Sequence, residues 1–456
     1  MRVAGLVLLV AIAGHASVLG VSTAAPSLTE ARVRAELPAA EQRPWLEYLR
    51  RSQHQMAADK AALAAERTGT KELPTQAKEG NSARAIPLHA EAAFYKSAEA
   101  RQLGDAILSF QTPAGGWSKN LALVAPRARG EGYTTNNLSR YLGEDDFDAP
   151  KDPNWNYVGT LDNDATNTEL RYLALLSAAW PGHEGDAYRA SFIRGIEYLL
   201  AAQYPNGGWP QVWPLEGGYH DAITFNDDAV TESAETLTLA AGGGRWPVVS
   251  EPPTQPTVVP AARTVYADYS FVPEDVRFQA RLAVGRALQC ILKTQQRVGG
   301  VLTVWSQQVD PLTLQPVSGR NFEPAALSSG ESASVMEYLM AVPNPSPEVV
   351  RAVESAAAWF EAHKIMGYTW SGGRTTPGGR KLTAVAGAGP LWARYYSLGD
   401  SAHGGGKPVF GDRDKTIHDD VMELSLERRN GYAWYSNGPE RVLAEVPGWK
   451  KSLGKN

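Results

Sequence analysis

The chain has 456 residues, of which 44 are Lys or Arg and 49 are Asp or Glu, giving a net charge of −5. This balance creates no global field that would attract nucleic acid, and no basic run with interleaved aromatic residues is present, so nucleic-acid binding is not expected. The single cysteine, Cys290, excludes an intrachain disulfide framework, and its apolar helical surroundings predict a buried structural thiol.

The N-terminus has the pattern of a secretory signal. A single Arg precedes an apolar run over residues 3–13, and small residues follow near position 25. The run is shorter than the roughly 20 residues that span a membrane. We therefore expect a signal peptide at residues 1–25 and a secreted or periplasmic protein that does not associate with a membrane.

Next in the chain comes a predicted helical segment and a linker. Apolar residues recur at helical spacing over residues 28–66, whereas residues 67–87 are polar and rich in turn-forming residues. We accordingly divide the mature chain into an N-terminal segment with linker, 26–90, and a main domain, 91–456. Within that domain, the Pro-rich stretch 242–263 has few periodic apolar residues and is interpreted as a surface insertion.

The main domain contains an internal repeat. Gln111, Gln203 and Gln295 are separated by 92 residues each time, and each ends an amphipathic helical pattern before a Gly-Gly turn and a Trp. Equal spacing predicts about three equivalent helix hairpins. Helix hairpins repeated around an axis form an α/α toroid, so we expect an all-α fold whose long loops form a central cleft.

Paired carboxylates directly precede two of the predicted helices. Asp162 and Asp164 stand before one helix, and Asp227 and Asp228 before another. Helix capping is the ordinary explanation, and three sites fit it: Thr166 with Glu169, Ser328 with Glu331, and Asp228 alone. Two such segments at one end of a toroid would also present hard oxygen ligands for calcium.

Arginines gather in the C-terminal part of the chain. Arg394, Arg413 and Arg428 lie in loop-like contexts, and ordinary ion pairs, such as one between Arg413 and Asp412 or Asp414, would explain each of them singly. Together with aspartates they would suit the carboxylates of an anionic polymer, since the guanidinium group binds a carboxylate with two hydrogen bonds. The 13 Trp and 18 Tyr offer flat surfaces for sugar rings, although most of them belong to the core.

An acidic polysaccharide could be cleaved in two ways at such a site. A proton next to the uronate carboxylate becomes removable when cations neutralise the developing charge, and β-elimination follows. Hydrolysis would instead require two carboxyl groups, for which Asp162 and Asp227 are candidates. Elimination is preferred because it gives the arginines a role.

Several motifs in chain order resemble the family 10 polysaccharide lyases, which are pectate lyases. They are "GGWSKN", "TLDNDATNTELRYLA", "NGGWPQVWP", "YHDAITFNDDAV", "GRNFEPAALSSGES", "WARYY", "FGDRD" and "ERRNGYAWY". The resemblance covers about residues 95–435, so 91–456 would be the catalytic domain. It implies calcium-assisted β-elimination of polygalacturonate in a toroid cleft, giving 4,5-unsaturated oligogalacturonides.

The resemblance also implies roles for individual residues. Asp162 and Asp227 look like the carboxylates that hold calcium or calcium-bound substrate, and Arg413 looks like the general base. The positions that match contacts to the uronate chain are Lys119, Arg320, Arg394 and Arg428. Asp164 departs from the family pattern, which commonly has Gly there, and the loop between residues 395 and 408 is longer and richer in Gly.

Arginine is a demanding base because its intrinsic pKa lies above about 12. A neutral Arg413 requires nearby positive charge, which predicts a strongly alkaline optimum. Two other functions remain open. A non-catalytic protein that binds acidic polysaccharide would not need Arg413, and a terpene-cyclase-like toroid would need an Asp-rich motif that this chain lacks. We expect the protein to act as a monomer.

Overall fold

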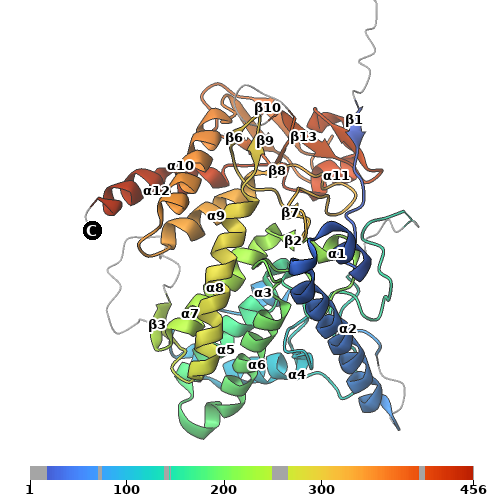
Figure 1. Cartoon of the computed structure of the whole chain (residues 1–456), viewed down its shortest axis with the longest axis vertical. Coiled ribbons are helices and arrows are strands. Elements are labelled where there is room, and N and C mark those ends of the chain that lie inside the picture. The colour runs from blue at the N-terminus through green and yellow to red at the C-terminus, as the bar shows by residue number, and fades with distance from the viewer. Residues whose placement is uncertain are drawn as a thin grey trace, which may run out of the picture.

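The computed structural model describes residues 18–69, 74–137, 143, 145–248, 265–399 and 406–454. Helices account for about 47% of it and strands for about 12%. The all-α class is therefore wrong, and a closed toroid of helix hairpins is not established, since the fold mixes helices with small sheets. Most of the strands lie in the upper part of Figure 1, and a group of helices forms the lower part.

The repeat is present as a series of helices that end in equivalent ways. Gln111, Gln203 and Gln295 each directly follow a helix, and each donates its side-chain amide, at 2.9 Å, to a backbone carbonyl of the next helix in the series. The series consists of α4 (Ala98–Phe110), α6 (Asp186–Ala202), α8 (Glu274–Thr294) and α10 (Pro347–Ala362). The Gln side chain thus joins each repeat to its successor.

The glycine after each of the first two Gln residues has a steric reason. Gly115 and Gly207 have φ angles of 107° and 98°, which other residues rarely adopt. A Cβ atom would lie 2.4 Å from the carbonyl oxygen of Arg194 in the first case and 2.1 Å from that of Arg286 in the second. These turns can therefore approach the next helix only because they lack a side chain.

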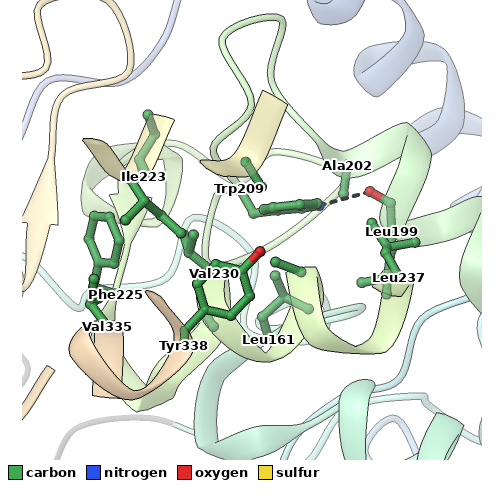
Figure 2. Packing of buried hydrophobic residues seen from close by; sticks show 14 of the residues in the cluster. Leu161, Leu199, Ala202, Trp209, Ile223, Phe225, Val230, Leu237, Val335 and Tyr338 are labelled. Carbon is green, nitrogen blue, oxygen red and sulfur yellow. Dashed lines mark hydrogen bonds between the residues drawn. The ribbon is translucent and has the colours of Figure 1, made fainter. Parts of the chain in front are cut away.

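The tryptophan of each repeat belongs to the core. Trp117, Trp209 and Trp305 are fully buried, and each indole donates a hydrogen bond of 2.7–2.8 Å to a carbonyl of the preceding helix. Figure 2 shows the bond from Trp209 to Leu199 within the packed apolar side chains. Cys290 is likewise buried, as expected, and burial raises the pKa of its thiol to about 12.

Shorter turns and further helices connect and cover the repeats. The other α-helices are α3 (Ser82–Ala85), α5 (Asn167–Ala179), α7 (Ala229–Gly242), α9 (Ser329–Ala341), α11 (Leu426–Gly431) and α12 (Gly438–Leu453). The 3-10 turns are η1 (Phe94–Lys96), η2 (Asp162–Asp164), η3 (Gly182–Gly185), η4 (Gly218–Asp221), η5 (Asn226–Asp228) and η7 (Val421–Glu423).

The main sheet has five strands in the order β1-β14-β13-β12-β8, and all of its pairs are antiparallel. Its strands have two to four residues, too few to show the alternation by which a sequence reveals a strand. They are β1 (Val18–Val21), β8 (Leu327–Ser328), β12 (Tyr395–Tyr396), β13 (Pro408–Gly411) and β14 (Thr416–His418).

The other strands form two-stranded antiparallel pairs. These are β2 (Ile223–Thr224) with β7 (Gln308–Val309), β3 (Arg245–Val248) with β4 (Val265–Asp268), β5 (Arg297–Val298) with β6 (Val301–Leu302), β9 (Tyr368–Ser371) with β10 (Lys381–Ala384), and β11 (Trp392–Ala393) with β15 (Tyr435–Ser436). The β3–β4 pair flanks the expected insertion, most of which lies outside the described residues.

The predicted N-terminal helical segment is confirmed as α1 (Glu30–Glu36) and α2 (Ala39–Arg67). It is tied to the rest of the fold, because the Tyr48 hydroxyl donates to the Ala202 carbonyl at 2.9 Å and Arg32 pairs with Asp310 at 2.8 Å. Residues 1–17 of the expected signal peptide lie outside the described residues, whereas residues 18–25 include β1. Within the described ranges, no helix combines the length and apolar character needed to cross a bilayer.

Candidate active site

Two short turns bring the candidate calcium carboxylates together. Asp162 lies in η2 before α5, and Asp227 lies in η5 before α7. The backbone N–H of Asn163 donates to the Asp227 carboxylate at 3.1 Å. The side-chain amide of Asn226 donates to Asp162 at 3.2 Å and to Asp227 at 2.8 Å. Backbone and amide groups therefore hold both carboxylates against each other.

Helix capping does not account for these segments. Thr166, Asp228 and Ser328 occupy the N-cap positions of α5, α7 and α9, but none of their side chains accepts a capping hydrogen bond. Thr166 and Asp228 have positive φ angles of 67° and 57°, unlike the extended backbone of an ordinary N-cap. The N-cap positions were predicted correctly, but the expected hydrogen bonds to the side chains of these N-cap residues were not.

Lys119 joins this pair from the loop after α4. Its ammonium group forms a buried ion pair with Asp162 and lies 3.5 Å from the centre of the Tyr157 ring. Burial disfavours the charged form of Asp162, yet the charge and hydrogen bond of Lys119, together with Asp227 and the charge of Arg320, outweigh burial and lower the pKa of that carboxyl. Burial and the charge of Asp162 raise the pKa of Asp227 well above its ordinary value. The two carboxylates of Asp162 and Asp227 therefore carry more negative charge than the single ammonium group of Lys119 neutralises.

Three arginines gather around one aromatic ring on the basic side of the site. The guanidinium carbons of Arg428, Arg320 and Arg413 lie 4.0, 4.9 and 5.2 Å from the centre of the Phe322 ring. Arg320 precedes Arg413 by 93 residues and Arg428 by 108, and contact with one ring brings the three charges together. Phe322 is itself fully buried, which fixes the position of the group.

The three arginines differ in their partners. Arg320 pairs with Glu323 at 2.6 Å, and Arg413 pairs with Glu427 at 3.1 Å rather than with the neighbouring aspartates considered above. Arg428 is only 4% exposed, and no described carboxylate forms an ion pair with it. Burial, with the charges of Arg413 and Arg320, lowers its pKa.

Arg394 connects the basic and acidic sides. It lies between β11 and β12, donates to Asn226 at 3.3 Å and pairs with Glu331 at 2.5 Å. Its guanidinium carbon lies 4.6 Å from the centre of the Tyr432 ring, which Arg428 also approaches, at 5.2 Å. All seven predicted site residues therefore belong to one connected set of contacts.

Asp164 does not join this set. The residue is exposed and has a φ of 59°, and among the described residues its side chain makes no hydrogen bond. Sequence reasoning missed Gln211, which donates to Asp162 at 2.8 Å, and gave no role to Asn226, Phe322, Glu323 or Tyr432. All five of these residues lie inside the motifs quoted above, and Gln211 directly follows the conspicuous Trp-Pro pair, which was the available signal.

Comparisons with known proteins agree on one family. A family model described as pectic acid lyase matches residues 111–244 and 257–443. The structure is similar to that of a family 10 polysaccharide lyase from Cellvibrio cellulosa, with 28% identity and a TM-score of 0.60 over 79% of this chain and 95% of that chain.

A second solved structure is an aspartate-to-alanine mutant of a family 10 polysaccharide lyase from Cellvibrio cellulosa, in complex with trigalaturonic acid. It has 28% identity and a TM-score of 0.59 over 78% of this chain and 95% of that chain. No curated protein sequence matches the chain.

Proposed function

The chain belongs to the pectic acid lyase family and is a pectate lyase, and from this premise we propose that it cleaves polygalacturonate by calcium-assisted β-elimination with Arg413 as the general base. Family membership confirms the resemblance found in the motifs. It also excludes the terpene-cyclase-like toroid that the sequence had left open. The observation that supports the finer mechanism is the convergence of three arginines on Phe322 beside the Asp162–Asp227 pair.

The basic side is suited to bind uronate carboxylates. Arg428 is buried with no carboxylate partner among the described residues, so a substrate carboxylate would supply the missing counter-charge. Arg320 and Arg394 already pair with glutamates, and Lys119 pairs with Asp162. We infer that these three contact the chain on either side of the reacting sugar while their acidic partners keep them in place.

The acidic side fits a calcium ion. Asp162 and Asp227 are held against each other, and the raised pKa of Asp227 reflects negative charge that a cation would neutralise. No group of three acidic, His or Cys side chains in the described part of the chain could close around a metal, so substrate oxygens and water would complete the coordination. Bound calcium would withdraw electron density from the uronate carboxylate and make the adjacent proton more acidic.

Arg413 would then accept that proton. Its side chain is 23% exposed, which gives substrate access to the guanidinium group. The guanidinium groups of Arg320 and Arg428 share the Phe322 ring with Arg413, so positive charge gathers around the group that would take the proton. Loss of the 4-linked sugar completes the elimination and leaves a double bond between C4 and C5 of the new end.

The decisive experiment follows the ultraviolet absorbance of the unsaturated product on polygalacturonate, with calcium and with a chelator. We expect product only in the presence of calcium and a rate that rises into the alkaline range. New reducing ends without unsaturated product would indicate hydrolysis, and binding without cleavage would indicate a non-catalytic module. Either result would overturn the mechanism.

The proposal includes export by the N-terminal signal and action as a monomer. Mass spectrometry of the protein recovered outside the cytoplasm would test the first point by the mass of its N-terminal peptide. Light scattering in solution would test the second. A full-length chain retained in the cytoplasm, or a dimer at working concentration, would contradict the respective expectation.

A further inference from the structure

A cavity of about 320 Å³ lies outside the set of site residues described above. Three of its lining residues, Ser27, Met56 and Lys60, come from the N-terminal segment, which precedes the first residue of the family match, 111. The others come from the segments 147–156 and 215–220. The N-terminal helices therefore build one wall of a cavity whose other walls belong to the catalytic domain.

The walls of the cavity contain unused hydrogen-bonding capacity. Trp155, Asn156 and His220 are more than nine-tenths buried, and each has a side-chain nitrogen without a hydrogen-bond partner in the described structure. Glu216 has one such oxygen, and burial raises the pKa of its carboxyl to about 8. Four polar groups of this kind therefore lie in the walls of one cavity, although buried polar groups are normally paired.

Two lysines give the cavity a positive rim. Lys60 pairs with Asp152 at 2.8 Å, and its ammonium group lies 5.6 Å from the centre of the Trp155 ring. Lys151 reaches the opposite segment, where its ammonium group would be only 2.3 Å from a Cβ atom placed on Gly217. Asp152 balances Lys60, whereas Lys151 forms no ion pair with a described carboxylate and interacts only electrostatically with the buried Asp221. The combination of an ammonium group, amide and indole donors is that of a site for a sugar acid.

The cavity shares a wall with the active site. The centre of the His220 ring lies 4.6 Å from that of the Tyr157 ring, and the ammonium group of Lys119 lies 3.5 Å from the centre of the same Tyr157 ring. Gln211 links the same wall to the site, because its backbone N–H donates to the His220 carbonyl and its side chain donates to Asp162. A chain bound near Lys119 could therefore extend to this side.

We propose that the cavity is an accessory subsite for a galacturonate unit of the substrate, with Lys151 and Lys60 facing its carboxylate and the walls its hydroxyl groups. The volume accommodates a sugar ring, and a carboxylate on that ring would give Lys151 an ion-pair partner that a neutral sugar lacks. This inference rests on the proposed function for the identity of the sugar. It gives the N-terminal segment a role in holding the polymer.

The test uses the full chain and measures the dissociation constant of galacturonic acid by calorimetry. The monomer has no glycosidic bond, so binding is measured independently of cleavage. We expect the double variant Lys60→Ala/Lys151→Ala to bind galacturonic acid about tenfold more weakly, the scale of losing a charged hydrogen bond. Galactose, which lacks the carboxylate, should bind weakly to both proteins and show no such difference.

A charge-matched control variant is Lys364→Ala/Lys450→Ala, which removes two lysines from the ion pairs with Glu361 and Glu354 far along the chain. It should bind galacturonic acid as the original protein does. Met56→Phe supplies a second, uncharged perturbation, since it fills part of the cavity from α2, and it should also weaken binding.

The outcomes separate this inference from the proposed function. Equal binding by the original protein and by both cavity variants would show that the cavity holds only water and would overturn the subsite, even with calcium-dependent elimination intact. Lysine-dependent binding without any unsaturated product would refute the elimination mechanism and keep the subsite. With both proposals correct, the double variant raises KM for polygalacturonate more than it lowers kcat.

Discussion

The two sides of the active site are held in place by different kinds of contact. The acidic side lies on turns that precede α5 and α7, where Asn163 and Asn226 bind the carboxylates through backbone and amide hydrogen bonds. The basic side lies in loops and in α11, where Arg320, Arg413 and Arg428 share the face of a buried ring. Hydrogen bonds from backbone and amide groups hold the two carboxylates, whereas cation–π contacts, with ion pairs to Glu323 and Glu427, hold the guanidinium groups.

This difference has a functional rationale. A cation site requires oxygens at defined positions before the ion binds, and hydrogen bonds from a rigid turn provide them. A base and its neighbouring arginines must instead accommodate successive sugars, and cation–π contacts of about 0.5–2 kcal/mol each tolerate small shifts. Substitutions on the basic side are therefore expected to change the rate, and substitutions on the acidic side to change calcium binding as well.

The largest effect is expected on the basic side, from Arg413→Ala. Removal of the base should lower kcat by about a thousandfold, within the range for general base catalysis. The melting temperature should change little, because the side chain is partly exposed. Initial rates of unsaturated product and a thermal melt measure both quantities. Near wild-type activity of Arg413→Lys at neutral pH would contradict the assigned role.

On the acidic side, Asp227→Asn should lower kcat/KM by about a hundredfold and weaken calcium binding. The same change removes a half-buried carboxyl that lies against Asp162, so the protein without calcium should become more stable. Calorimetric titration with calcium and urea unfolding test the two parts. Asp228→Asn is the matched control, since Asp228 lies next to Asp227 but takes no part in the carboxylate pair; equal losses in both variants would count against the pair.

Away from both sides of the active site, the N-terminal helix α2 carries a buried carboxylate whose effect on stability depends on pH. Asp59 of α2 is fully buried, and burial raises its pKa to about 6, above the value of about 3.9 in an unfolded chain. Its ionisation therefore opposes folding, and the stability present at pH 4 is lost as the pH rises through 6. Asp59→Asn should stabilise the protein by about 2 kcal/mol at pH 8 and by little at pH 4.

Urea unfolding at the two pH values measures this effect. The control is Asp105→Asn, at an exposed position of α4. It should change the free energy of unfolding by the same amount at both pH values. A stabilisation by Asp59→Asn that is the same at pH 4 and pH 8 would rule out ionisation as its cause.

The smallest effect is expected from a change at the aromatic ring that the three arginines share. Phe322→Leu keeps an apolar side chain but removes the ring face shared by three arginines, and kcat/KM should fall by about tenfold, the sum of weak cation–π contacts. Calcium affinity should stay unchanged because the carboxylate turns do not contact the ring. An equal loss of calcium affinity would show that the two sides are mechanically coupled.

Much of the site could be predicted from the sequence because its residues lie in local motifs. The Gln, Gly and Trp of each repeat are a few positions apart, and their spacing reflects contacts between a helix, its turn and the next helix. The same locality placed Asp162 and Asp227 before helices. The fold class was predicted less well, because five strands of two to four residues show no alternation and because β1 pairs with β14 across almost the whole chain.

The sequence by itself determined the family, the repeated helices and the types of residue that would act. Only the tertiary structure decided which of them meet. Phe322, an ordinary apolar residue in the chain, gathers three arginines, and Asn226 joins two carboxylates from separate turns. These contacts depend on packing between segments about 64 to 110 residues apart. No local sequence pattern predicts such packing.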